Sequence, residues 1–548
     1  MPALDGRVAE LLVKFDKQER SVADLLCDGY DAADLAYRIV HRDLTSRDLT
    51  YGELKHESER FAAGLARLGV GKGDRVATLM GKSRSLVVTV MAIWRLGAVY
   101  VPMFTAFAPP AIALRLNGSG AKCVICDVSQ EAKLQPGIDI PATAPWTTIT
   151  TGSGHDDILS FDAVASSSDD EVAACATAGD DAIIHIFTSG TTGKPKGVVV
   201  PKRALAAFQA YGEFGLDLRK DDLYWCAADP GWAYGLYFGI LSSLTTGTHS
   251  LLLEGGFTPE TTLAVLSRFG VTNFTAAPTV YRSLRAAGLS VPSGLPLRCA
   301  SSAGEPLTPD VNEWAATNLG VPVHDHYGQT EAGMLINNHH HSDLNRPLKQ
   351  GSMGQPMPGW SAVILHETRD EPVGPNVKGR VAMDLEASPL AWFRGYPLDP
   401  GKSAEKFAGG GRWYLTGDVG SMDDDNYFRF SSRDDDVIIM AGYRIGPFEI
   451  ESVLATHPAV LESAVIAVPD DIRGEVLEAF VVLRDDARPD QSLEQELQQW
   501  VKVRYAAHAY PRTVHFLKGL PKTPSGKVQR FVLRQQRRAD CSSPSQRD

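Results

Sequence analysis

Short apolar runs alternate with stretches of helically spaced apolar residues along most of the chain. Buried strands are expected at residues 75–80, 122–126, 250–253, 271–276, 297–302 and 321–325. Helices are expected from residue 51, at 83–96, from residue 202 and at 261–268. This alternation predicts a layered α/β domain, in which binding sites gather beyond the carboxyl ends of the strands.

The C-terminal part of the chain has a different pattern. Strands at 437–441, 460–468 and 478–483 are expected to combine with helices at 448–456, 492–504 and 529–537 in a small separate α+β domain. A charged run at 431–436 separates two apolar strands and predicts a hinge, although a solvated turn is the alternative. We therefore predict domains at 1–433 and 434–548, with the last ~10 residues disordered because they are rich in Ser, Asp and Arg.

The length and charge of the chain limit its function. Its 548 residues exceed the roughly 250 to 300 at which one core stops growing, so at least two domains are expected. A formal net charge of −12 argues against nucleic acid or an anionic membrane as the main partner and favours small molecules. Neither a signal-peptide pattern nor a membrane-spanning apolar stretch is found, which predicts a soluble, cytoplasmic protein. The oligomeric state stays open, a homo-oligomer included.

The cysteines and histidines give only weak metal signals. Seven scattered cysteines fit a reducing compartment. Cys123 and Cys126 resemble half of a zinc site, but they lie in a predicted strand without a second pair at zinc spacing, so we predict buried cysteines. The histidines at 339–341 could bind a metal too, although a solvated loop is favoured.

The most informative polar segment is Thr-Ser-Gly-Thr-Thr-Gly-Lys-Pro-Lys-Gly at 188–197. Apolar runs at 182–187 and 198–200 flank it, which predicts a hairpin-like turn between buried strands at a sheet edge. Its glycines let N–H groups converge on an anion, and its hydroxyls and lysines favour a polyphosphate. A P-loop is excluded, because two residues separate the first glycine from Gly-Lys and a proline follows. The alternative is a mobile surface turn.

Three further features suit a nucleotide. Residues 303–306, Ala-Gly-Glu-Pro, predict a turn that can lie flat under a ring. Residues 326–331, His-Tyr-Gly-Gln-Thr-Glu, place four kinds of binding group in one predicted loop. Within it Glu331 suits Mg²⁺, which binds one or two carboxylates together with substrate phosphates, although a solvated charge is the alternative. Asp418, predicted at the end of a strand, could accept both ribose hydroxyls.

Six segments together resemble the adenylate-forming superfamily, in the same order and at matching spacing: residues 188–197, 304–306, 327–331, 414–418, 433–444 and 521–527. Residues 441–449 and 473–476 are most similar to medium-chain acyl-CoA synthetases, with the acetyl-CoA synthetases as the nearest relatives. Lys527 is by itself an ordinary exposed lysine on a Pro/Gly turn, and it gains a role only from this resemblance.

The resemblance implies a large multilayered α/β domain with a small mobile α+β domain and an AMP-forming acid–thiol ligase of fatty acid metabolism. A carboxylate would attack the α-phosphate of ATP to give acyl-AMP and pyrophosphate, and the thiol of coenzyme A would then displace AMP. ATP, Mg²⁺ and coenzyme A are the implied cofactors. A carboxylic acid is the implied partner.

Residue roles follow from the same match. Catalytic roles are implied for Lys527, Thr330, Glu331 and Arg444, with Glu331 as the metal ligand. The implied ATP-binding residues are Thr188, Ser189, Gly190, Thr191, Thr192, Gly193, Lys194, Lys196, Gly304, Glu305, Pro306, Asp325, Tyr327, Gly328, Gln329, Thr330, Asp418, Arg433 and Lys527. The implied coenzyme A contacts are Ala441, Gly442, Tyr443, Arg473 and Arg512. The small domain would rotate about Asp435, exchanging the face that carries Lys527 for the coenzyme A face.

The acyl pocket is implied to be lined by Trp232, Ala233, Tyr234, Ala303 and Gly328. Acetyl-CoA synthetases carry a tryptophan at the position of Gly328, so glycine there opens room for a chain. No acidic group lines the pocket, so we expect an uncharged medium-chain or aromatic acid. Neighbouring lengths should be accepted, since one methylene is worth only about 1 to 3 kcal/mol.

Other functions stay open from the sequence. Acetate or propionate is one alternative substrate. Tyr234 is larger than the residue expected in acetate enzymes, so it can reshape the pocket rather than deepen it, and the chain length stays open. A second alternative is a stand-alone adenylation enzyme that serves a carrier protein or an amine. A third is a non-catalytic nucleotide sensor, against which the presence of both Glu331 and Lys527 argues.

Overall fold

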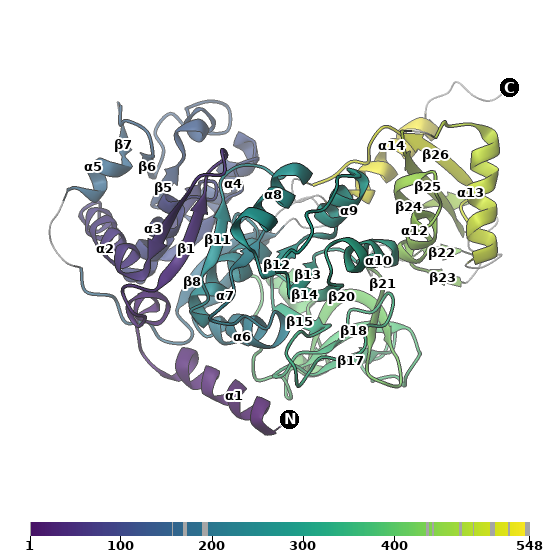
Figure 1. Ribbon diagram of the computed structural model, residues 1–548, viewed down its shortest axis with the longest axis horizontal. Coiled ribbons are helices and arrows are strands. Elements are labelled where there is room, and N and C mark those ends of the chain that lie inside the picture. The colour runs from purple at the N-terminus through teal and green to yellow at the C-terminus, as the bar shows by residue number, and fades with distance from the viewer. Residues whose placement is uncertain are drawn as a thin grey trace.

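The computed structural model describes residues 2–155, 157–167, 172–188, 196–433, 438–440, 443–470, 474–485, 487–504, 510–523 and 527–542. The chain forms a large N-terminal domain and a small C-terminal domain, which lie beside one another in Figure 1. Among these residues the large domain has three β-sheets and the small domain a fourth. The predicted fold class is confirmed.

The first sheet has seven strands in the order β7-β6-β5-β3-β4-β8-β9. They are β3 (Arg75–Leu79), β4 (Val99–Pro102), β5 (Cys123–Cys126), β6 (Thr147–Thr150), β7 (Ile158–Ser160), β8 (Ala182–Thr188) and β9 (Lys196–Pro201). Neighbouring strands are parallel except β8 and β9, which form an antiparallel pair at the sheet edge. The predicted hairpin at the edge of a sheet is therefore confirmed.

The second sheet has nine strands in the order β16-β15-β14-β13-β12-β10-β11-β1-β2. They are β1 (Leu35–Val40), β2 (Ser46–Thr50), β10 (Tyr224–Cys226), β11 (Ser250–Leu253), β12 (Asn273–Ala276), β13 (Cys299–Ala303), β14 (Val323–Gln329), β15 (Gly333–Asn337) and β16 (Gln355–Pro356). The six central strands from β14 to β1 are parallel, so their carboxyl ends share one edge.

The third sheet has five strands in the order β17-β18-β20-β19, with β21 paired to β20. They are β17 (Ala362–Leu365), β18 (Gly379–Asp384), β19 (Phe407–Ala408), β20 (Trp413–Met422) and β21 (Phe428–Arg433). All its pairs are antiparallel. In Figure 1 this sheet lies below the small domain and beside β14 and β15.

The helices of the large domain include three that pack into one continuous core with both large sheets: α2, α3 and α6. The α-helices are α1 (Pro2–Leu12), α2 (Tyr51–Arg67), α3 (Arg84–Arg95), α4 (Pro109–Ser119), α5 (Phe161–Ala165), α6 (Ala204–Ala210), α7 (Ser242–Thr246), α8 (Pro259–Phe269), α9 (Pro278–Ala286), α10 (Pro309–Asn318) and α11 (Pro400–Ala404). A wider turn, η4 (Tyr211–Gly215), continues α6, and another, η5 (Gly235–Leu241), leads into α7. Helix α3 is buried from Leu86 to Arg95, as its continuous apolar sequence predicted.

The small domain consists of one mixed sheet with three helices. Its strands are β22 (Ile438–Met440), β23 (Tyr443–Ile445), β24 (Val460–Asp470), β25 (Gly474–Leu483) and β26 (Thr513–Leu517). Its helices are α12 (Pro447–Ala455), α13 (Gln491–Arg504) and α14 (Arg530–Ser542). Helix α14 ends at Ser542, within the tail for which we predict disorder, and residues 543–548 lie outside the described part of the chain.

The two domains are incompletely packed against one another. A hollow of about 490 Å³ lies between α10 and the end of α12, and its walls include Arg285, Asp310, His457 and Arg484. Polar, imperfectly filled contacts of this kind are typical of domains that move relative to each other. No helix in the described part of the chain is long and apolar enough to cross a membrane.

Candidate active site

The β8–β9 hairpin brings Thr188 opposite Lys196 at the edge of the first sheet. The positions between them lie outside the described residues: Ser189, Gly190, Thr191, Thr192, Gly193 and Lys194. A Cβ on Gly197 would lie 2.4 Å from Nε2 of His185, so the base of the hairpin requires glycine unless that ring moves. Burial lowers the pKa of His185 to about 4, so the ring is neutral.

Asp418 is the centre of a network that joins three sequence motifs. The residue is 3% exposed, and Nη1 of Arg433 on the neighbouring strand donates to Oδ1 at 2.8 Å. The hydroxyl of Tyr327 and Nε2 of Gln329, the latter at 2.8 Å, donate to Oδ2. The amide oxygen of Gln329 accepts from the hydroxyl of Tyr414 at 2.9 Å. These donors fix the direction of the carboxylate.

The position of these residues corrects two predictions. Asp418 lies in the middle of β20 rather than at a strand end. Residues 326–329 belong to β14 rather than to a loop, and only Thr330 to Ala332 form the turn into β15. Both differences arise because the polar side chains are satisfied by partners on the neighbouring strand β21 or across the two sheets, which lets charged sequence enter a sheet.

Glu331 and Lys196 meet at a residue that the sequence did not single out, Tyr396. The hydroxyl of Tyr396 donates to Oε1 of Glu331 at 2.7 Å, and Nζ of Lys196 lies 5.2 Å from the centre of its ring. The hairpin base and the turn after β14 are therefore joined by one aromatic side chain. No local motif marks Tyr396, so only the fold reveals it.

The segment after β13 lies beside Asp325. Gly304 has a φ of +102° and open space where a Cβ would lie, so its backbone presents a free face. Glu305 is held away from that face by Arg282 at 2.8 Å and by the Thr279 hydroxyl at 3.0 Å, and Pro306 follows it. Asp325 accepts a long bond from the Leu307 N–H at 3.3 Å, and burial raises its pKa to about 8.

The implied acyl-pocket residues lie around an aromatic wall. The ring of Trp232 packs against Phe104 and Phe107 at 5.3 and 5.5 Å between centres. Tyr234 contacts Tyr211 and Phe238, while Ala233 is half-buried against the main core and Ala303 is buried at the end of β13.

Gly328 is tightly enclosed by the next strand. A Cβ there would lie 2.2 Å from the carbonyl oxygen of Gly333 and 2.6 Å from Sδ of Met334. The pairing of β14 with β15 is irregular between Tyr327 and Gly328, which brings the two backbones together at this point. β15 therefore crowds the position at which a larger residue would begin.

The remaining implied residues are on the turn after β14 and in the small domain. The carbonyl of Thr330 accepts from Tyr237 at 3.2 Å. Lys527 is exposed, and its backbone N–H donates to the Thr523 hydroxyl at 3.0 Å. Arg512 lies over the ring of Tyr510 at 4.0 Å. Tyr443 and Arg444 lie on β23, whereas Asp435, Ala441, Gly442 and Arg473 lie outside the described residues.

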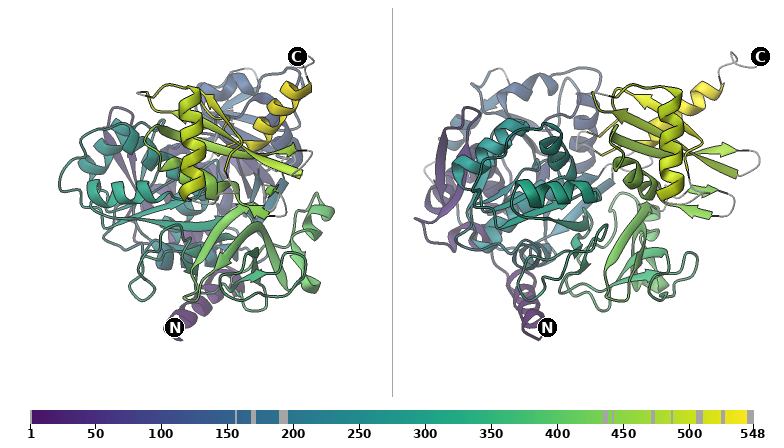
Figure 2. Two further views of the ribbon diagram at one scale, coloured as in Figure 1. Left: turned by 90° about the vertical axis from the view of Figure 1, so that its right-hand side faces the viewer. Right: turned by 45° about the vertical axis from the view of Figure 1, so that its right-hand side comes forward.

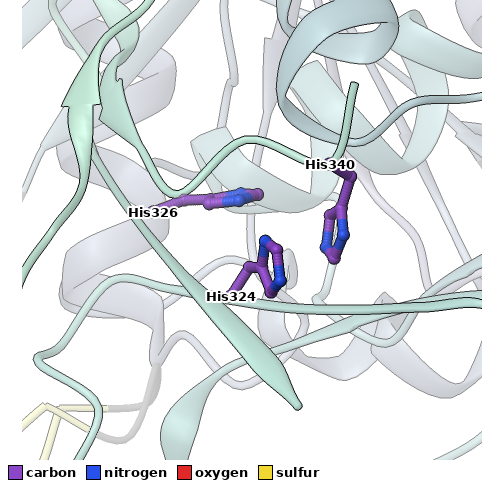
Figure 3. Close-up of side chains that lie close together, drawn as sticks. All are labelled: His324, His326 and His340. Atoms are coloured by element: carbon purple, nitrogen blue, oxygen red, sulfur yellow. The ribbon is translucent and has the colours of Figure 1, made fainter. Parts of the chain in front are cut away.

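The histidines form a cluster that the sequence did not predict. His324 and His326 of β14 approach His340, as Figure 3 shows, and one ring nitrogen from each lies within 4.8 Å of the others. His339 beside them is 3% exposed, so the predicted solvated loop is wrong. His326 has no free lone pair, because Nε2 bonds the Asn338 carbonyl at 2.9 Å and Nδ1 bonds Tyr211 at 2.6 Å. The cluster therefore does not have three available metal ligands.

The cysteine prediction is confirmed. Cys123 and Cys126 are buried, unpaired residues of β5, and burial raises the pKa of both thiols. Such cysteines act as small apolar side chains.

Comparisons with known proteins match this arrangement over nearly the whole chain. A family model described as AMP-binding enzyme matches residues 32–396, and one described as AMP-binding enzyme C-terminal domain matches residues 449–527. Acetyl-coenzyme A synthetase of Bacillus subtilis is 35% identical over 514 residues, which cover 91% of this chain and 86% of the relative. The mitochondrial acyl-coenzyme A synthetase ACSM3 of Mus musculus is 35% identical over 498 residues, 88% of this chain and 83% of the relative. The crystal structure of an acyl-CoA synthetase from Brucella canis is 41% identical with a TM-score of 0.75, and the match covers 98% of each chain.

Proposed function

The chain belongs to the family of AMP-binding enzymes, and from this premise we propose that it activates an uncharged carboxylic acid with ATP and transfers the acyl group to coenzyme A. It is an acyl-CoA synthetase of the AMP-forming class. The acid we propose is medium-chain or aromatic. The proposal rests chiefly on the network at Asp418, where side chains from two other motifs converge on its carboxylate.

The reaction has two displacements. A carboxylate oxygen of the acid forms a bond to the α-phosphorus of ATP, and the bond to the oxygen that bridges to the β-phosphate breaks, releasing pyrophosphate. The sulfur of coenzyme A then forms a bond to the acyl carbon, and the carbon–oxygen bond to AMP breaks. The first step depends on positioning and charge neutralisation rather than on a covalent contribution from the protein.

We propose the ATP contacts that the resemblance implies. The hairpin that begins at Thr188 and ends at Lys196 would hold the β- and γ-phosphates, and Asp418 with Arg433 would hold the ribose. Tyr327 and the free backbone face of Gly304 would border the adenine. Thr330, on the turn between β14 and β15, would contact the α-phosphate.

Glu331 fits the role of a Mg²⁺ ligand. Its Oε1 accepts from Tyr396, and no hydrogen bond to Oε2 is found among the described residues. A carboxylate with one oxygen fixed and one free can bind a cation that also contacts substrate phosphates. When bound, Mg²⁺ would neutralise phosphate charge, and Tyr396 would orient the ligand oxygen.

Replacing Tyr396 with phenylalanine should lower kcat for acyl-AMP formation by about 10- to 100-fold, the worth of one hydrogen bond to a charged group. The loss should be larger at low Mg²⁺ concentration, because the carboxylate is less well oriented. The rate of acyl-AMP formation is measured as acid-dependent exchange of pyrophosphate into ATP at several Mg²⁺ concentrations. Tyr427→Phe is the control, since its hydroxyl only donates to the Pro347 carbonyl away from the site; an equal loss in both variants would contradict the assignment.

The kcat/KM for ATP should change with pH because of Asp325. Its carboxyl has a pKa of about 8 in the free protein, so it is mostly protonated at pH 6.5 and mostly ionised at pH 8.5. The amino group of adenine donates a hydrogen bond, which only the ionised form accepts fully. We expect kcat/KM for ATP to rise by up to about tenfold over this range.

Asp325→Asn provides the comparison for this experiment, because its side chain does not titrate. The ratio of the two pH profiles removes the titration of ATP itself. Parallel profiles would show that Asp325 does not contact the nucleotide in its ionised form.

The two-domain arrangement supports alternation between the steps. The segment that leads into α14 extends toward the large domain, while the β22–β23 hairpin lies on the outer side of the small domain (Figures 1 and 2). We propose that this arrangement suits adenylation and that rotation at the predicted boundary after Arg433, about Asp435, would bring residues 441–443 to the site. Arg473 and Arg512 would then contact the phosphates of coenzyme A.

A chain-length scan tests the substrate. Purified protein is assayed for coenzyme A-dependent AMP release with linear acids from acetate to about C12 and with benzoate-type acids. We expect the highest kcat/KM between about C4 and C10 or with an aromatic acid. A maximum at acetate or propionate would overturn the proposed class. Acid-dependent pyrophosphate exchange without thioester formation on coenzyme A would instead favour another acceptor, and no exchange with any acid would favour a nucleotide sensor.

A further inference from the structure

A chain of hydrogen bonds leads from the interior of the large domain to the aromatic wall of the site. The carbonyl of Asn338 lies 2.9 Å from Nε2 of His326, and Nδ1 of the same ring lies 2.6 Å from the hydroxyl of Tyr211. That hydroxyl lies 2.8 Å from the hydroxyl of Tyr234. His326 and Tyr211 are buried, whereas Tyr234, the last residue in this series of hydrogen bonds, is half-buried.

The direction of every hydrogen bond in this chain is fixed from its inner end. A carbonyl only accepts, so Nε2 of His326 carries the hydrogen. Burial lowers the pKa of His326, so the ring is neutral and Nδ1 can only accept. Tyr211 must then donate to His326, and its oxygen accepts from the hydroxyl of Tyr234. Tyr234 has therefore used its single hydrogen within the protein.

The oxygen of Tyr234 keeps a lone pair, because its one hydrogen-bond partner within the described ranges, Tyr211, accepts from it rather than donating to it. Resting on the proposed function, in which Tyr234 lines the acyl pocket, we propose that this oxygen is a fixed hydrogen-bond acceptor that selects acids bearing a hydroxyl or uncharged amino group on the acyl body. An acid of the same size that carries only an acceptor at that point would place its lone pair against the lone pair of the Tyr234 oxygen, and the two would repel. A purely apolar acid would leave the acceptor unpaired.

Matched acids test this selectivity in the intact enzyme. Hydroxy-, amino-, methyl- and methoxybenzoates substituted at each ring position are compared, together with ω-hydroxy, alkyl and methoxy aliphatic acids of equal length. We expect at least one donor-bearing acid to exceed its methoxy partner in kcat/KM by about three- to tenfold, the size of one hydrogen bond. The difference should lie mainly in KM, because the contact is present in ground and transition states alike.

Two substitutions separate an oriented acceptor from simple pocket shape. Tyr211→Phe removes the group that takes the hydrogen of Tyr234, so the freed hydroxyl can both donate and accept. The preference over acceptor-bearing acids should then be lost, while both kinds of polar acid keep an advantage over apolar ones. Tyr234→Phe should abolish the preference in both directions. Tyr281→Phe is the control, because the buried hydroxyl of Tyr281 donates to the Ser301 carbonyl at 2.9 Å and is not part of this series of hydrogen bonds. The substrate ratios of this variant should match those of the unmodified protein.

The outcomes are distinguishable. If the unmodified protein activates no acid of either set, the proposed function fails. If acids are activated but donor and acceptor partners have equal kcat/KM, the inference about Tyr234 is overturned while the proposed function stands. If Tyr211→Phe does not fold, Tyr234→Phe alone decides, since a preference that survives it excludes Tyr234 as the acceptor.

Discussion

Replacing Lys527 with alanine is expected to lower the rate of acyl-AMP formation by about 100-fold or more while leaving thioester formation from supplied acyl-AMP largely intact. The side chain is exposed at the end of a loop that Thr523 holds through backbone contacts. None of the described carboxylates pairs with its ammonium group, which is available to the charge that develops on the α-phosphate and the attacking carboxylate. Removing one such donor typically costs about 10² to 10³ in rate.

Acid-dependent exchange of pyrophosphate into ATP measures the first step, and release of AMP from synthetic acyl-AMP and coenzyme A measures the second. Lys518→Ala is the matched control, because that lysine is exposed on the same domain. It should change neither rate. Equal loss of both half-reactions in Lys527→Ala would contradict the assignment of the lysine to adenylation alone.

Replacing Asp418 with asparagine is expected to raise KM for ATP by about 100-fold. The carboxylate receives hydrogen bonds from Tyr327, Gln329 and Arg433 and would accept the ribose hydroxyls as well. Hydrogen bonds to a charged group are worth about 1.5 to 3 kcal/mol each, so losing two of them accounts for this factor. The new amide would also point a donor toward the guanidinium of Arg433 or the amide nitrogen of Gln329, neither of which can accept.

Asp384→Asn provides the control within the same sheet. Asp384 is 7% exposed and pairs with Arg412 at 2.7 Å, so its substitution tests the cost of removing a paired carboxylate away from the proposed nucleotide contacts. KM for ATP is measured for both variants with the acid saturating, together with the thermal midpoint. If both variants raise KM equally, or if Asp418→Asn loses activity only in proportion to its thermal midpoint, Asp418 has no direct role with ATP.

The sequence predicted the parallel strands β3, β5, β11, β12, β13 and β14 because each is a short apolar run between turn residues, whereas β1, β4, β6, β7 and β10 were not predicted. Helix α3 and the β8–β9 hairpin followed from the same local signals. Asp418 in mid-strand and Tyr396 beside Glu331 could not be predicted, because their positions depend on partners that are distant in sequence. The burial of His339 was missed for the same reason, since polar composition usually indicates solvent.

The motif residues were predictable as a set because they recur in order, whereas their mutual geometry was not. Tyr327 and Gln329 were expected to contact a nucleotide from a loop, yet they donate to Asp418 from a strand. The direction of the hydrogen bonds through Tyr211 was also hidden, since it is set by the backbone carbonyl of Asn338. Tertiary contacts, rather than residue types, decide these properties.

The close approach of β15 to Gly328 makes the size of the acyl pocket an epistatic property. Because a Cβ at this position would meet the backbone of Gly333, a tryptophan introduced alone would disturb the β14–β15 pair before it could cap the pocket. A short-chain enzyme would need substitutions that shift the backbone at residues 333–334 before it could hold a tryptophan at this position. The order of substitutions, and not only their identity, would then determine which acids a descendant of this chain could use.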